Sequence, residues 1–239
     1  MSTAETSAAL VADTVQFVSD GQSIRAYLAR PPTAARPLPA VLIIHEWWGL
    51  TDHMKDLARR FAKEGYAALV PDLYARQGSA VTTDANEAAK LMSQLSSQHA
   101  LRDLNAATAY LTRQAWIEPS RIGVVGFCMG GTLALTTATH NSDVKAAVIF
   151  YGKVPPIETL DSLLCPILFH HGAQDGWVTG KEVDTLRQGL TQYGKRGEVV
   201  SYPAAGHAFF NDARPDAYHP ASAAQAWQRT LRFFTEHLR

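Results

Sequence analysis

The chain has 239 residues, of which 46% are hydrophobic, and its 22 Lys and Arg balance its 22 Asp and Glu. A chain of this length can bury one α/β core without disulfides or metals to stabilise it, so we expect a single domain over residues 1–239. A formal charge of zero, without a basic stripe or a membrane-length apolar run, argues against nucleic acid and membrane as partners.

Residues 1–13 come first and contain neither the basic nor the apolar segment of a secretory signal, and we expect them to be loosely ordered. The two cysteines, Cys128 and Cys165, lack CxxC spacing, so they indicate neither a disulfide framework nor a zinc site. We therefore expect a cytoplasmic monomer in a reducing compartment, with no metal and no cofactor.

Two alternating β-type runs follow and meet at Asp20-Gly21, a strong signal for a hairpin. The later strand signals include continuous apolar runs, which are typical of strands covered on both faces. The predicted strands are 14–18, 23–29, 40–44, 66–70, 121–125, 144–150, 166–169 and 198–202.

Apolar residues at helical spacing predict helices between these strands. Thr51 or Asp52 can cap the first helix, which Gly65 ends, and a long helical region over 84–114 is interrupted near Ser96-Ser97. The remaining predicted helices are 132–138, 181–193 and 221–238. Strands that alternate with helices predict a mainly parallel, doubly covered sheet, to which the hairpin adds an antiparallel edge.

The sequence around Cys128, Gly126-Phe-Cys-Met-Gly-Gly131, joins a predicted strand to a helix rich in small residues. Glycines on both sides permit the sharp turn that would expose the thiol, and the helix end favours the thiolate. Cysteine is also among the most frequently buried residues, so this motif alone leaves a structural role open.

Two partners for the cysteine follow later strands, because catalytic groups in such sheets gather beyond the carboxyl ends of the strands. Asp175 lies in a glycine-rich loop after strand 166–169, and His207 lies in a loop after the last strand. A carboxylate can hold the histidine in one tautomer while its other nitrogen moves a proton. Taken alone, Asp175 could be an ordinary turn residue and His207 a surface histidine. The order nucleophile, acid, histidine along the chain, however, matches that of an α/β-hydrolase.

These motifs resemble those of the dienelactone hydrolases (carboxymethylenebutenolidases) of the α/β-hydrolase superfamily, and the resemblance spans nearly the whole chain. It rests on the cysteine elbow, on Gly172-Ala-Gln-Asp175, on Ala205-Gly-His-Ala-Phe209 and on His45-Glu-Trp-Trp-Gly49. It implies an α/β-hydrolase fold that cleaves a lactone or ester, of the dienelactone-to-maleylacetate type, through a cysteinyl thioester.

Carried to this chain, the resemblance implies that Cys128 is the nucleophile, His207 the base and Asp175 its orienting acid. It also implies that Glu46 accepts the thiol proton once substrate binds. A nearby carboxylate disfavours a thiolate, so Glu46 would keep the resting thiol protonated. An ion pair with an arginine at the strand end is the structural alternative for Glu46.

The natural donors of an oxyanion hole are the backbone N–H groups of Met129 and Trp47. The family's substrate-binding arginine matches Arg76 in Pro71-Asp-Leu-Tyr-Ala-Arg76, and its alternative role is an ordinary loop charge. The best-known members carry a second arginine four residues after the histidine. This chain has Asn211 there, which we expect to bind substrate, and an arginine, Arg214, three positions further.

Aromatic residues near the strand ends complete the expected substrate-binding residues, with Trp48, Tyr151 and Phe209 beside Trp47 as candidates for an apolar pocket. Only about fifteen residues separate two strands between which many relatives insert a cap, so we expect no cap domain. Two alternatives remain: a thiol carboxylesterase for uncharged esters and a non-catalytic small-molecule binding protein of the same fold.

Overall fold

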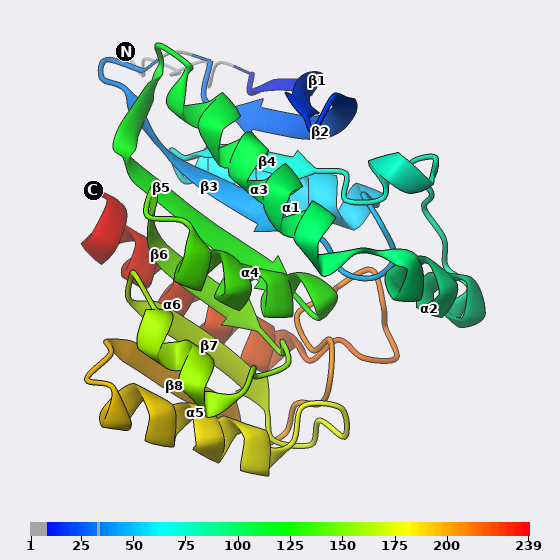
Figure 1. The fold of residues 1–239 in the computed structure, drawn as a ribbon, viewed down its shortest axis with the longest axis vertical. Coiled ribbons are helices and arrows are strands. Elements are labelled where there is room, and N and C mark those ends of the chain that lie inside the picture. The colour runs from blue at the N-terminus through cyan, green and yellow to red at the C-terminus, as the bar shows by residue number, and fades with distance from the viewer. Residues whose placement is uncertain (1–8, 33) are drawn as a thin grey trace, which may run out of the picture.

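The structure is a computed structural model in which residues 9–32 and 34–239 are described, and one sheet of eight strands organises them (Figure 1). Along the sheet the strands have the order β1-β2-β4-β3-β5-β6-β7-β8. The strands are β1 (Val11–Ser19), β2 (Gln22–Arg30), β3 (Leu38–Ile44), β4 (Ala67–Pro71), β5 (Ile117–Phe127), β6 (Val144–Phe150), β7 (Ile167–Gly172) and β8 (Gly197–Tyr202).

Strand direction follows the sequence pattern. The hairpin β1–β2 is antiparallel, as Asp20-Gly21 predicts, and β2 also pairs antiparallel with β4. All the remaining pairs are parallel. Strand β3, in the middle of the sheet, is buried along its whole length, which explains its continuous apolar sequence.

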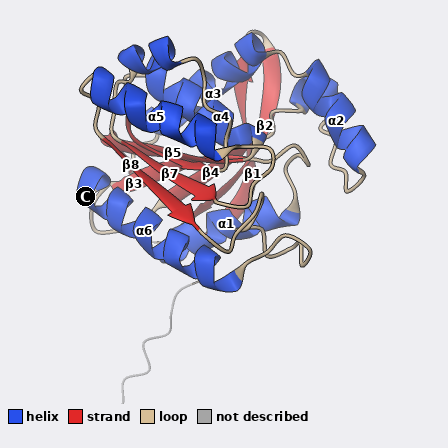
Figure 2. Ribbon diagram, turned by 90° about the horizontal axis from the view of Figure 1, so that it is seen from below, coloured by secondary structure: helices blue, strands red, loops and turns tan. Residues whose placement is uncertain are grey.

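The described part of the chain forms six α-helices around the sheet (Figure 2). Helices α3, α4 and α5 cover one face and α1 and α6 cover the other, while α2 stands at the edge of the molecule (Figures 1 and 2). The helices are α1 (Asp52–Lys63), α2 (Ala85–Gln94), α3 (Ser97–Thr112), α4 (Met129–His140), α5 (Gly180–Gln192) and α6 (Pro220–Leu238).

Most predicted elements are confirmed, including the cap of α1 by Thr51 and the break between α2 and α3. The prediction of a loose segment over 1–13 is wrong for its last residues, because Val11–Asp13 pair with β2 in the sheet. Residues 1–8 of that segment lie outside the described residues. Strand β7 runs through His170 and His171 to Gly172, further than predicted, because β8 pairs with these residues.

The fold is that of an α/β-hydrolase without a separate cap domain. Between β6 and β7 the only helical segment is the short 3₁₀ helix Ile157–Ser162. Within the described residues, none of the helices combines the length and hydrophobicity needed to cross a membrane. Within residues 9–32 and 34–239, loops and α2 lie beside the carboxyl ends of the parallel strands.

Candidate active site

The cysteine elbow has the sharp geometry that its glycines predict. Cys128 follows β5 directly and has φ 55° and ψ −117°, a conformation that side chains rarely adopt. A Cβ on Gly126 would lie 1.9 Å from the carbonyl oxygen of Gly130, and a Cβ on Gly130 would lie 2.2 Å from that of Ile44. Glycine is therefore required at both positions, and the turn places the thiol at the start of α4.

The thiol is kept in its protonated form. Cys128 is only 8% exposed, and burial is the main cause that raises its pKa, followed by the negative charge of Glu46. Hydrogen bonds from the backbone N–H groups of Met129 and Trp47 act in the opposite direction and are outweighed. The helix end therefore favours the thiolate, as the sequence predicts, but burial and the charge of Glu46 outweigh it and keep the resting thiol protonated. The same two N–H groups converge at the sulfur, where an oxyanion hole needs them.

Asp175 and His207 form the expected pair at the ends of β7 and β8. Nδ1 of His207 donates to Oδ2 of Asp175 at 2.7 Å, while Oδ1 accepts the N–H groups of Trp177 and Val178 at 2.7 and 2.9 Å. Burial acts to raise the pKa of Asp175, but these hydrogen bonds outweigh it and hold the pKa below its ordinary value. The carboxylate thus stays ionised and leaves Nε2 of His207 free of its proton, in the tautomer that a base requires.

Glu46 lies directly after β3 and is 3% exposed. Asn211 Nδ2 donates to its Oε2 at 2.5 Å, and the Tyr151 hydroxyl donates to its Oε1 at 3.4 Å. Burial raises the pKa of Glu46, although these bonds and the proximity of His207 oppose the shift. No ion pair neutralises Glu46 among the described residues, so a carboxyl group with a raised pKa stands ready to accept a proton.

The end of β3 is fixed by His45, which is fully buried. Its Nε2 accepts the N–H of Leu73 at 3.1 Å, so its Nδ1 carries the proton and donates to the carbonyl oxygen of Glu46 at 2.6 Å. Burial lowers the pKa of His45, which keeps the ring neutral. The described residues contain no cluster of three or more His, Cys, Asp or Glu side chains suited to a metal ion.

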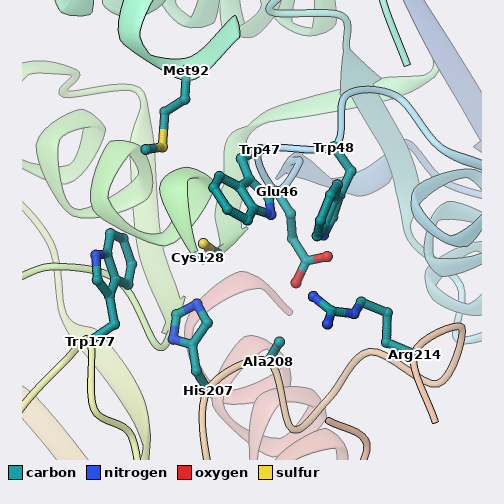
Figure 3. A pocket seen from close by; sticks show the side chains of 9 residues that line it. All are labelled: Glu46, Trp47, Trp48, Met92, Cys128, Trp177, His207, Ala208 and Arg214. Atoms are coloured by element: carbon teal, nitrogen blue, oxygen red, sulfur yellow. The ribbon is translucent and has the colours of Figure 1, made fainter. Parts of the chain in front are cut away.

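A cavity of about 140 Å³ opens over the thiol (Figure 3). Its polar groups are Glu46, Cys128, His207 and Arg214. The apolar wall consists of Trp47, Trp48, Met92, Trp177 and Ala208. Figure 3 shows the four polar groups around one space, which His207 and Arg214 reach from the loop after β8.

Arg76 does not reach this cavity. Its guanidinium bonds both carboxylate oxygens of Asp103 in α3, at 2.8 and 3.3 Å, and donates to the carbonyl oxygen of Ser19 at 3.0 Å. The structure therefore gives Arg76 a structural pairing and offers no support for its predicted contact with substrate. The arginine at the cavity is Arg214, whose guanidinium lies 5.2 Å from the ring centroid of Trp48.

Tyr151 and Phe209 are both 0% exposed, so they support the site from beneath instead of lining the cavity. The Tyr151 ring packs against the rings of His207 and Phe209, with centroids 5.1 and 5.6 Å apart. Asn211 likewise acts through its bond to Glu46. These three predicted substrate-binding residues are thus positioned to hold the catalytic groups.

Three residues that contribute to the candidate site were not identified from the sequence. Trp177 stands two residues after Asp175 and packs edge-on against the ring of His207, so the acid loop itself was the available signal. The Tyr74 hydroxyl donates to the carbonyl oxygen of Trp47 at 2.9 Å and thereby fixes a residue that is predicted to form the oxyanion hole. Met92 comes from α2, and no sequence motif indicates that it lines the cavity.

Comparison with known proteins gives consistent matches. A sequence model of the dienelactone hydrolase family matches residues 24–238. A protein of Escherichia coli (strain K12) named "Putative carboxymethylenebutenolidase" is 36% identical over 246 residues, covering 96% of this chain and 88% of that protein. A Bradyrhizobium protein named "Probable 2-oxo-3-(5-oxofuran-2-ylidene)propanoate lactonase" is 34% identical, covering 95% of this chain and 94% of its own length. The crystal structure titled "Putative Dienelactone Hydrolase" from Klebsiella pneumoniae has a TM-score of 0.91 at 36% identity, covering 96% of this chain and all of that one.

Proposed function

The chain belongs to the dienelactone hydrolase family and is a carboxylic ester hydrolase, and from this premise we propose that it cleaves its lactone or ester through a thioester on Cys128. One observation carries the proposal: Cys128, Glu46 and His207 line one small cavity, and His207 is paired with Asp175 behind it. The backbone N–H groups of Met129 and Trp47 act on the same thiol. Nucleophile, oxyanion donors and base are then all within one small space.

In the first half of the reaction, Glu46 takes the proton of the Cys128 thiol. Its raised pKa makes it a stronger base than an exposed glutamate, and protonation removes the negative charge that opposes the thiolate. The sulfur then attacks the carbonyl carbon while the N–H groups of Met129 and Trp47 hold the oxyanion. The carbon–oxygen bond breaks, and the alcohol leaves with the proton that the thiol gave up.

In the second half, His207 removes a proton from water at Nε2, and the hydroxide attacks the thioester carbonyl. Asp175 stabilises the imidazolium that forms, because its carboxylate accepts the Nδ1 proton. The carbon–sulfur bond breaks, the acid is released, and the thiolate recovers a proton from His207. No step requires a metal or a cofactor.

Replacing the nucleophile tests the mechanism directly. We expect Cys128→Ala to lose several orders of magnitude in kcat on short-chain esters, because the covalent route is removed. Cys165→Ala is the matched control, since Cys165 is buried outside the cavity and should keep wild-type kcat. Mass spectrometry after acid quenching should find the acyl group on Cys128. A folded Cys128→Ala variant with near-normal turnover would rule the thioester out.

Arg214 supports a substrate with a carboxylate, since its guanidinium lines the cavity. Its present partner is the carboxylate of Asp216, whose side chain is 65% exposed, so a substrate carboxylate would compete with a solvent-exposed ion pair. The name of the Bradyrhizobium relative describes a lactone of a propanoate, which carries such a group. Arg214→Ala should therefore raise KM for carboxylated lactones by about tenfold or more while changing KM little for neutral esters.

Arg76→Ala provides the matched arginine control, because its pairing with Asp103 lies away from the cavity. It should lower the free energy of unfolding and leave KM for both substrate classes unchanged. Equal effects of Arg214→Ala on both classes would instead favour a thiol carboxylesterase for uncharged esters.

A further inference from the structure

A second cavity, of about 230 Å³, adjoins the catalytic cavity and shares Met92 and Trp177 with it as wall residues. The catalytic cavity alone, at about 140 Å³, is smaller than the roughly 300–1,000 Å³ typical of small-molecule sites. Both cavities together reach the lower end of that range. The space available to a substrate therefore extends past the nucleophile in the direction of these two side chains.

The walls of this second cavity are mainly apolar. Met92 and Leu95 come from α2 and its C-terminal cap, Met129 and Leu133 come from the first turns of α4, and Trp177 comes from the acid loop. We refer to this space as the side cavity. An alkyl group that enters it leaves water and gains contact with thioether, aliphatic and indole surface.

The one charged residue that lines the side cavity, Lys153, is already paired. Its Nζ lies 3.1 and 3.2 Å from the two carboxylate oxygens of Glu182 and 5.1 Å from the ring centroid of Trp177. It also donates to the carbonyl oxygen of Trp177. The Lys153 ammonium group thus already has an ion-pair partner and a hydrogen-bond acceptor. The described residues that line the side cavity therefore include no unpaired cation that could bind an anionic group.

The position of His207 decides which part of an ester would lie in the side cavity. Water attacks the thioester from the place that the leaving alcohol has vacated, so the leaving oxygen must lie beside the histidine that activates water. The His207 ring touches Trp177, with centroids 4.9 Å apart. Figure 3 shows Trp177 to the left of Cys128 and Arg214 to the right, with His207 below the thiol and next to Trp177.

We propose that the side cavity binds an apolar alcohol portion of the ester, or an apolar substituent on the alcohol carbon of a lactone, while the acyl portion extends toward Arg214. The substrate class is then an ester with a polar or anionic acyl group and an alkyl group of several carbons on the ester oxygen. This inference rests on the proposed function, because it assigns a substrate portion to the same nucleophile.

Two matched series of esters test the proposal in the wild-type enzyme. The first keeps the acyl group fixed and lengthens the alkyl alcohol from methyl to octyl, and the second keeps a methyl alcohol and lengthens the acyl group. In the first series, kcat/KM should rise about two- to fourfold per methylene until the cavity is filled, as expected for buried methylenes. The second series should show a clearly smaller rise.

A substitution that fills part of the side cavity, together with a matched control, provides a second test. Ser97 lines the side cavity, is exposed and stands at the start of α3, so Ser97→Phe adds bulk there without disturbing the core. The neighbouring exposed residue Gln98 does not line it, and Gln98→Phe is the control. Ser97→Phe should remove most of the rise of kcat/KM with alcohol length, whereas Gln98→Phe should keep the wild-type rise.

The outcomes separate this inference from the proposed function. If no ester is hydrolysed, or if Cys128→Ala still turns over, the proposed mechanism fails first. If esters are hydrolysed but kcat/KM does not depend on alcohol length, or depends on acyl length instead, the assignment of the side cavity is wrong. Equal losses in Ser97→Phe and Gln98→Phe would also overturn it.

Discussion

At the scale of single residues, the charge of Glu46 opposes the ionisation of Cys128. Burial raises the pKa of both groups, and the charge of Glu46 adds to the shift at the thiol. The resting enzyme therefore contains a thiol that reacts slowly with oxidants and alkylating agents, since the thiolate is the reactive form. In the proposed mechanism, transfer of the thiol proton to Glu46 ends this protected state.

Glu46→Gln separates these two roles. Removal of the negative charge lowers the pKa of the Cys128 thiol, so alkylation by iodoacetamide near pH 7 should accelerate, by about tenfold for each unit of pKa change. Lactone turnover should collapse, because the proton acceptor is gone. Glu198→Gln, at an exposed position on β8, is the control and should alter neither rate. Rapid, pH-independent alkylation of the wild type, with normal turnover by Glu46→Gln, would leave Glu46 without a catalytic role.

Sequence reasoning placed the nucleophile, acid and histidine in one site because short motifs at strand ends specify backbone geometry locally. It could not place Arg76, since its partner Asp103 lies in α3 and captures the guanidinium through a tertiary contact. Arg214 presents the opposite case. It stands in a long loop between β8 and α6, and only the folded loop shows that its side chain reaches Trp48.

At the scale of secondary structure, hydrophobic periodicity predicted nearly every strand and helix, but several ends were displaced. Strand β5 begins at Ile117, before the predicted residue 121, because polar residues 118–121 follow its first buried side chain and hide the strand. Helix α4 begins directly after Cys128, whereas the sequence pattern predicts helix only from Thr132. The sequence pattern does not indicate this first turn, because it contains Gly130 and Gly131 and glycine has a low helix propensity.

His170 connects three elements and is completely buried. Its ring nitrogens lie 2.9 Å from the Tyr202 hydroxyl and 3.1 Å from Oγ1 of Thr230, so it links β7 to β8 and α6. Burial, followed by the positive charge of Arg229, lowers the pKa of His170 to about 3. The ring remains neutral in the folded protein at pH values where the unfolded chain is protonated.

This difference predicts how stability depends on pH. Between pH 6.5 and about 3 the unfolded state binds a proton at His170 that the folded state does not bind, so stability falls as the pH falls through this window. The slope from this residue is at most about 1.4 kcal/mol per pH unit. His170→Gln should make the slope shallower in urea denaturation between pH 4.5 and 7, whereas exposed His140→Gln should keep it. An unchanged slope in His170→Gln would contradict the assignment.

At the scale of the whole molecule, the described surface lacks an extended apolar patch. Its exposed large hydrophobic residues are Val18, Val81, Leu164 and Trp177, and they belong to separate segments. Monomeric proteins show scattered apolar residues of this kind, whereas stable interfaces need a contiguous area. We therefore expect sedimentation equilibrium to give the mass of one chain, 26.1 kDa, at micromolar concentrations. A concentration-independent dimer would refute this expectation.

Helix α2 buries only Ala88 and Leu91, yet it supplies a wall of the space beside the nucleophile. The residues assigned to the chemistry are all elsewhere in the chain, on loops held by the sheet. Substitutions at the exposed positions of α2 should cost little stability, typically within about 0.5 kcal/mol each. If the side cavity binds the alcohol portion as proposed, residues 85–95 influence substrate preference without contributing a reacting group, so variation within them can change which alcohols are accepted while the reaction itself is inherited unchanged.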